Sequence, residues 1–295
     1  MALIMVFIAE ISGEKEIIFP EICALTIGAW ASEKQPWITN KRRIFFLMST
    51  ASLFGVLITR YIQIPLIFQV CLCFGFTGFI LSLFKTNFIP IISACILPVY
   101  LGTKSWIYPL SVTVMSLIII TAQWLMEKFH LRPVNNFIPC NFNIKEQIIK
   151  WLKLLLVFGF IALIPFKTHQ VYFLAPPLIV MFTELSNPKS PARKKSGYII
   201  GLMTFAACTG CLLRFILNIQ LELPLVVSTT FACIILFIVL NKIKINFPPA
   251  GAILLIPMIL DEKLLLVFPF EVFIGAVVLS IASILLFKNS AFDNL

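Results

Sequence analysis

Long apolar segments recur along nearly the whole chain, and they constrain its fold more than any other feature. They extend over about 14–22 residues without the strict alternation that marks barrel strands. Hydrophobic residues make up 60% of the sequence and charged residues only 12%, roughly half the charged fraction of soluble domains. Because lipid offers the backbone no hydrogen-bond partners, such segments fold as helices. The sequence therefore predicts an all-α polytopic membrane protein.

The apolar segments predict about eleven transmembrane helices. They cover residues 17–31, 44–61, 63–84, 88–101, 106–126, 149–166, 171–186, 197–217, 223–240, 247–260 and 266–287. Residues 1–15 begin with an apolar stretch that is too short to span a membrane, and it lacks the basic start of a signal peptide. We expect an interfacial or partly inserted helix here, and its role is left open.

The two halves of the chain resemble each other. The matched landmarks keep their order and lie 155–160 residues apart: Pro20 and Pro176, Leu47-Met48 and Leu202-Met203, Gly55 and Gly210, Ile64-Pro65 and Leu223-Pro224, Asn87-Phe88 and Asn246-Phe247. Chance similarity between apolar segments does not readily give so many landmarks in order. We therefore predict two parallel five-helix repeats, 1–126 and 171–295. Residues 127–170 are expected to form a polar linker and one extra connecting span.

Positive charge predicts the orientation of the chain. With the loop 32–43 in the cytoplasm, eleven spans place sixteen of the 23 Lys and Arg residues inside and six outside. Basic residues collect in cytoplasmic loops of membrane proteins, so this bias accounts for the net charge of +10 without nucleic acid. We expect a multi-pass protein of the plasma or inner membrane, with its N-terminus outside and its C-terminus in the cytoplasm.

Four of the predicted spans are short and carry prolines near their starts: 17–31, 88–101, 171–186 and 247–260. Paired short spans interrupted by proline or glycine mark substrate sites in transporters. Asn87 and Asn246 are expected to cap two of these helices. The N–H groups of Phe247, Ala250 and Gly251 would then remain free near an anion. Close helix packing by small residues is the alternative explanation for this composition.

These considerations give a set of candidate substrate-binding residues. It comprises Asn87, Phe88, Pro90, Ser93, Asn246, Phe247, Pro248, Pro249, Ala250, Gly251, Pro20, Glu21, Pro176 and Pro177. Glu21 is either a proton or cation site or a helix-capping residue. We expect Glu184 to pair with the basic loop 187–196, and Glu271 to reach outward to the interface. The cysteines and two histidines show no convincing ligand spacing, so no metal, cofactor or catalytic residue is expected.

The second half, about 171–260, resembles the HPP family of integral membrane domains. The segment "LAPPLIVMFTE…NPKSPARKKSGYIIGLMTFAACTG" is similar to that family's first helix, basic loop and second helix, and "NFPPAGAILL" is similar to its His-Pro-Pro-Ala-Gly-Ala segment. Phe247 stands where the family has histidine, and in the first half the motif is reduced to Phe88-Ile89-Pro90. Some family members are associated with nitrite transport.

The sequence thus favours a transporter or channel for a small solute, with a nitrite-like inorganic anion implied by the resemblance. The alternative is a membrane subunit or assembly partner that transports nothing. We do not expect an enzyme, because no cluster of catalytic residue types is visible. The expected partners are the lipid bilayer and a small molecule or ion, without nucleic acid. Assembly into a homo-oligomer is left open.

Overall fold

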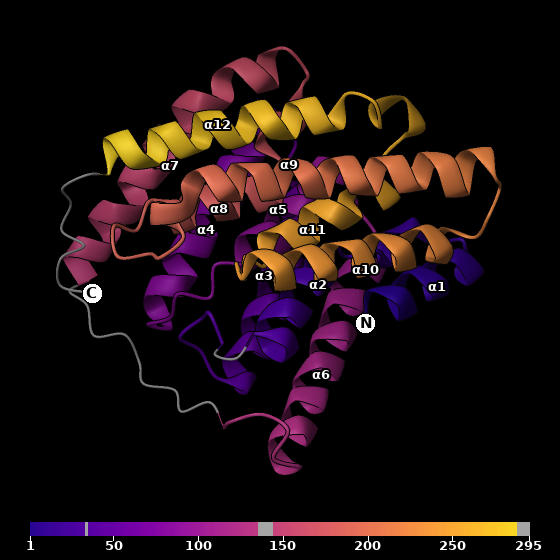
Figure 1. Ribbon diagram of the computed structural model, residues 1–295. Coiled ribbons are helices and arrows are strands. Elements are labelled where there is room, and N and C mark those ends of the chain that lie inside the picture. Colours follow the sequence, from indigo (N-terminus) through magenta and orange to yellow (C-terminus); the bar gives the residue numbers. More distant parts are fainter. Residues whose placement is uncertain (33–34, 135–143, 288–295) are drawn as a thin grey trace.

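The fold is helical throughout the residues that the computed structural model describes, which are all but 33–34, 135–143 and 288–295 (Figure 1). The helices are α1 (Ala2–Ser12), α2 (Glu21–Thr26), α3 (Lys41–Tyr61), α4 (Leu66–Leu83), α5 (Ile91–Leu101), α6 (Ile107–Lys128), α7 (Ile144–Lys167), α8 (Pro176–Leu185), α9 (Ser196–Leu213), α10 (Leu225–Ile243), α11 (Pro249–Leu255) and α12 (Phe268–Leu286). The predicted all-α class is confirmed.

Seven helices in the described ranges are long and apolar enough to cross a membrane: α3, α4, α6, α7, α9 with its extension to Gln220, α10 and α12. They coincide with seven of the eleven predicted spans. The other four predicted spans are the proline-marked ones, and they form shorter elements. Helix α2 continues as a π-helical turn to Ala31, a 3-10 turn precedes α8, and a 3-10 turn follows α11. Eleven spans therefore remain a prediction, whereas seven membrane-length helices are observed.

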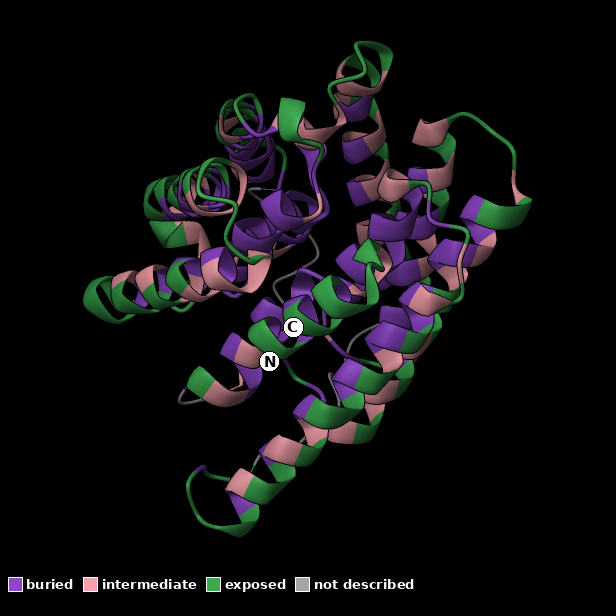
Figure 2. Cartoon of the chain, turned by 90° about the vertical axis from the view of Figure 1, so that its right-hand side faces the viewer, coloured by how far each residue is buried: buried purple, intermediate pink, exposed green. Residues whose placement is uncertain are grey.

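The four short, proline-marked helices α2, α5, α8 and α11 lie inside, and the long helices surround them (Figure 2). Nine of the ten residues of α8 are buried, as are all seven of α11. The long helices bury one side and expose the other. On α7, for example, Leu156, Phe160 and Ile164 are more than 70% exposed. Such a continuous apolar exterior suits contact with acyl chains rather than water.

Several helix pairs join the two halves of the chain. Helix α5 packs against α8, and α11 packs against α2. Helix α7 covers α4, while α1 lies against α10 (Figure 1). Under the alignment of the halves, α5 corresponds to α11, α2 to α8 and α4 to α10. The contact of α1 with α10 therefore corresponds to the contact of α7 with α4.

Helix α1, whose role the sequence leaves open, is held against α10 by a glutamate in its last turn. The Glu10 carboxylate accepts hydrogen bonds from the main-chain N–H groups of Leu225 and Val226, at 2.7 and 3.3 Å. These N–H groups begin α10, where no intrahelical acceptor is available and the helix dipole favours a negative charge.

Two glycines at corresponding positions of the two halves allow close helix contacts. A Cβ atom built on Gly55 of α3 would lie 2.1 Å from the Cys95 carbonyl oxygen and 2.7 Å from the Pro98 ring in α5. The same atom built on Gly210 of α9 would lie 2.4 Å from the Leu254 carbonyl oxygen and 3.0 Å from the Pro257 ring. Both glycines thus let a long helix approach the backbone of a short helix.

Candidate functional site

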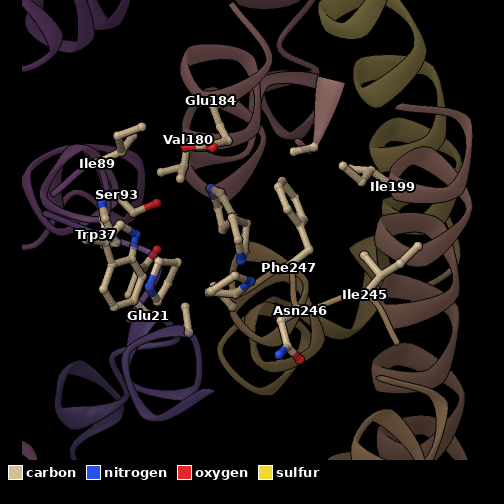
Figure 3. Close-up of a pocket in the computed structure, with 18 of the residues that line it drawn as sticks. Glu21, Trp37, Ile89, Ser93, Val180, Glu184, Ile199, Ile245, Asn246 and Phe247 are labelled. Atoms are coloured by element: carbon tan, nitrogen blue, oxygen red, sulfur yellow. The ribbon is translucent and has the colours of Figure 1, made fainter. Parts of the chain in front are cut away.

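A cavity of about 330 Å³ lies among the four short helices (Figure 3). Its lining comprises Glu21, Ala24, Pro36, Trp37, Ile89, Pro90, Ser93, Pro177, Val180, Glu184, Pro191, Ala192, Lys195, Ile199, Lys244, Ile245, Asn246, Phe247, Pro248, Pro249 and Ala252. Each of α2, α5, α8 and α11 contributes residues from its beginning. The remaining lining comes mainly from the loops before α3, α9 and α11.

The lining contains pairs of residues that correspond in the two halves of the chain. The pairs are Glu21 and Pro177, Ala24 and Val180, Pro36 and Pro191, Trp37 and Ala192, Ile89 and Pro248, Pro90 and Pro249, and Ser93 and Ala252. Their spacings of 155–159 residues are those of the sequence landmarks. In Figure 3, Glu21, Trp37, Ile89 and Ser93 lie on one side, and Ile199, Ile245 and Phe247 lie on the other. The cavity is therefore shared by the two halves.

Eight of the fourteen candidate residues line this cavity and six do not. Those in the lining are Glu21, Pro90, Ser93, Pro177, Asn246, Phe247, Pro248 and Pro249. Those outside it are Pro20, Asn87, Phe88, Pro176, Ala250 and Gly251. The structure thus brings together residues at the helix starts of both halves, while Ala250 and Gly251 of α11 face elsewhere.

The expected capping role of Asn87 and Asn246 is wrong. Pro90 and Pro248 are the N-cap residues of α5 and α11, and neither helix start has a side-chain cap. The Asn87 side chain instead accepts a hydrogen bond from the main-chain N–H of Ile38. Asn246 is exposed, and its side chain points away from the cavity centre in Figure 3. The turns between each asparagine and its proline move the helix start away from the amide.

The expectation of free N–H groups at the start of α11 is also wrong for two residues. The Ala250 N–H donates to the Phe247 carbonyl at 3.1 Å, and the Gly251 N–H donates to the Pro248 carbonyl at 2.9 Å. The tight first turn therefore uses the donors that an anion would need. The short helices α2 and α8 begin in the same way, with Ile22 donating to Phe19 and Leu178 donating to Ala175.

Gly251 serves helix packing. A Cβ atom at this position would lie 2.7 Å from the Ile27 Cδ1 atom and 2.9 Å from the Cys23 Sγ atom. The neighbouring Ala250 is fully buried. For these two residues the structure supports the packing explanation, in which small side chains let α11 approach α2.

Glu21 is the most unusual polar residue of the cavity. It is the first residue of α2 and only 1% exposed. Among the described residues, no group forms a hydrogen bond with either carboxyl oxygen, and the Ser93 hydroxyl is likewise unpartnered. Ser93 and the Glu21 main-chain N–H lie close enough to interact with the carboxyl electrostatically, although neither has hydrogen-bond geometry. Native proteins seldom leave buried polar groups unpaired, so these oxygen atoms are the polar groups of the cavity that need an explanation.

Glu184, Lys195 and Lys244 add charge nearer the mouth. The Ser190 hydroxyl donates to Glu184 at 2.7 Å, so the loop 187–196 does hold this carboxylate, through a serine. Lys195 and Lys244 are exposed where they line the cavity.

The outward reach expected for Glu271 is wrong, because its side chain is only 4% exposed at the start of α12. The 3-10 turn Val171–Leu174, which precedes α8, packs against α12. Glu271 thus belongs to helix packing outside the cavity.

Trp37 was missed by the sequence reasoning because it lies in a polar loop. Its ring covers Gly28, where an added Cβ atom would lie 2.3 Å from the indole, and it meets Phe88 edge to face at 5.2 Å. In the second half, Glu184 corresponds to Gly28 and Ala192 corresponds to Trp37. The first half thus combines a large loop side chain, Trp37, with a glycine on the helix. The second half combines a small loop side chain, Ala192, with a glutamate on the helix. Aligning the two loops would have suggested this exchange.

Comparison with protein families, with curated proteins and with solved structures finds no match to this chain. The resemblance to the HPP family therefore stays a prediction. Within the described residues, no group of three or more His, Cys, Asp or Glu side chains could hold a metal ion.

Proposed function

We propose that the protein is an integral membrane transporter or channel for a small solute, and that the solute binds in the cavity among α2, α5, α8 and α11. The observation that carries the proposal is the convergence of four short, proline-started helices on one cavity with an unpaired buried carboxyl group. Short or broken helices around a central site are the transporter arrangement. A cavity of about 330 Å³ lies at the lower end of the range for ligand sites, which favours a small solute.

Two parallel repeats related by a pseudo-twofold axis complete this proposal. The paired cavity lining, the contacts of Gly55 and Gly210, and the exchanged contacts of the short helices support it. The position of α1 extends each repeat to six helices, α1–α6 and α7–α12, so that α7 is the counterpart of α1 rather than an extra span. With the basic loops in the cytoplasm, the cavity opens toward that side.

A small inorganic anion is the solute that we favour, as the family resemblance implies. Lys195 and Lys244 at the mouth would attract it. The non-transporting alternative predicts that the proline-started helices pack together without a polar cavity. The presence of Glu21 and Ser93 in a cavity favours transport over that alternative.

Uptake of nitrite and nitrate into liposomes that contain the purified protein tests the proposal. Ala252→Leu fills the cavity at a position that is 1% exposed. Gly201→Leu is the control, since a side chain at this exposed glycine meets open space. We expect saturable uptake by the wild type and the control, and at least tenfold slower uptake by Ala252→Leu.

Unfolding temperature and size-exclusion profile establish that both variants are folded. Unchanged uptake by a folded Ala252→Leu protein would refute the cavity as the solute path. Absence of protein-dependent uptake for both ions would refute the transport of small anions.

A further inference from the structure

We propose that Glu21 is a proton-binding site within the solute cavity, and that its protonated form binds the anion together with Ser93. This inference rests on the proposed function. It starts from three oxygen atoms, the two of the Glu21 carboxyl and the Ser93 hydroxyl, which are buried without hydrogen-bond partners among the described residues. They come from α2 and α5 and line the same side of the cavity (Figure 3).

An ionised Glu21 would be poorly stabilised in this position. A buried carboxylate is stable only with a cation or with several donors, and the described surroundings of Glu21 provide neither in bonding geometry. The neutral acid avoids this cost and gains an O–H group. That group and the Ser93 hydroxyl then offer two hydrogen-bond donors, one from α2 and one from α5.

The charges of the lining lead to the same conclusion. Its charged side chains, in the described part of the chain, are Glu21, Glu184, Lys195 and Lys244. With Glu21 ionised, the two acids balance the two lysines. With Glu21 protonated, one positive charge remains, which suits one monovalent anion.

The titratable groups on the elements around Glu21 do not compete with it for a proton, so Glu21 is the proton acceptor in the deep part of the cavity. Helix α6 contributes Tyr108, whose hydroxyl interacts with the Glu21 charge but donates to the Ala94 carbonyl at 3.0 Å. Helix α11 contributes no titratable residue, and α5 contributes the thiol of Cys95. The thiols of Cys23 and Cys233 interact with each other beside α2. Glu184, Lys195 and Lys244 lie toward the mouth.

A metal cation is a poorer occupant than a proton. Hard metal cations take about six or more oxygen ligands. The deep wall offers the two oxygens of Glu21 and the hydroxyl of Ser93. A proton, in contrast, binds to a single carboxyl oxygen of Glu21.

The transport step that follows is electrically neutral. One proton binds to a Glu21 carboxyl oxygen, the resulting O–H donates a hydrogen bond to the anion, and no covalent bond to the anion forms. When the anion leaves on the other side, the proton leaves with it and Glu21 returns to its starting state. Anion affinity should therefore fall about tenfold for each pH unit above the titration of Glu21, because each bound anion requires one proton.

The experiment follows nitrate and nitrite uptake in liposomes together with internal pH, reported by an enclosed pH-sensitive dye. Wild-type uptake should acidify the interior and should not respond to a potassium diffusion potential. Protein-free liposomes correct for passive entry of nitrous acid.

Glu21→Gln keeps a neutral donor but cannot exchange a proton. It should take up anion without acidification, independently of external pH, and faster when the interior is positive. Glu271→Gln is the matched control, a buried carboxyl outside the cavity, and should behave as the wild type does. Ser93→Ala should weaken anion binding while keeping the proton coupling.

Wild-type uptake without internal acidification, or acidification that persists in Glu21→Gln, overturns this inference and leaves the proposed function standing. A Glu21→Gln protein that folds, as judged by its unfolding temperature, but takes up no anion also overturns it. Absence of uptake of both ions by the wild type overturns the proposed function and this inference with it.

Discussion

The substitutions Gly55→Ala and Gly210→Ala should each destabilise the protein. In most helices the change from glycine to alanine stabilises by about 1 kcal/mol. Here the new methyl group would lie 2.1 Å from the Cys95 carbonyl oxygen at Gly55, or 2.4 Å from the Leu254 carbonyl oxygen at Gly210. Relief requires movement of a helix by roughly 1 Å, because ordinary carbon–oxygen contacts lie well beyond 3 Å. A backbone carbonyl cannot rotate aside as a flexible side chain can.

The expected magnitude follows from two opposing terms. Overpacking a close-packed interior costs about 1–3 kcal/mol, and a rigid backbone obstacle favours the upper part of that range. Subtracting the helix gain of about 1 kcal/mol leaves a loss of about 1–2 kcal/mol. For a chain of this size, with an unfolding entropy of roughly 0.6 kcal/mol/K, that loss lowers the unfolding temperature by roughly 2–3 °C. Gly55→Ala should be the more damaging of the two, since its contact is the closer.

Unfolding of the detergent-purified protein, followed by tryptophan fluorescence at a fixed heating rate, measures the effect. Gly201→Ala is the matched control in α9, because an added Cβ atom there meets nothing within 4 Å. This control should be neutral or slightly stabilising. If Gly55→Ala and Gly210→Ala behave like Gly201→Ala, the close helix contacts at these two positions are refuted.

Two further predictions concern the N-terminal helix and the orientation of the chain. Glu10→Ala removes the carboxylate at the start of α10 and should cost about 0.5–2 kcal/mol, as lost helix caps do. It should also increase hydrogen exchange in α1. Glu14 is exposed, and among the described residues its carboxylate makes no hydrogen bond, so it should tolerate the same change. In a variant without native cysteines, Lys194→Cys should react with an impermeant thiol reagent only after permeabilisation, while Lys104→Cys should react in intact cells. The reverse pattern would contradict the predicted orientation.

Much of the architecture could be predicted because lipid imposes simple rules on sequence. Uninterrupted apolar segments of sufficient length gave the seven long helices, and prolines near the starts of shorter segments indicated α2, α5, α8 and α11. The correspondence of the halves then pointed to Glu21, Ser93 and Pro249 as neighbours of one site. Each of these predictions depends on local composition or on spacing, which a single sequence displays.

The errors arose where a residue's role depends on distant parts of the chain. Asn87 has the residue type of a helix cap, but its amide bonds to a loop 49 positions earlier in the sequence. The N–H groups of Ala250 and Gly251 were expected to be free because the tightness of the first turn cannot be read from residue types. Trp37 was missed because it lies in a polar loop, and its contact with Gly28 forms only when that loop folds back onto the end of α2.

The short helices of each half pack against those of the other half, and this has a consequence for how the protein folds during synthesis. During synthesis the first half emerges with α4 and α5 still lacking α7 and α8, and α1 has to wait for α10, more than 200 residues later. Neither half can close the cavity alone, because α2 and α5 of the first half and α8 and α11 of the second half all line it. Two fragments divided between residues 134 and 144 should accordingly be recovered as a stable pair when produced together, and each should be degraded when produced without the other.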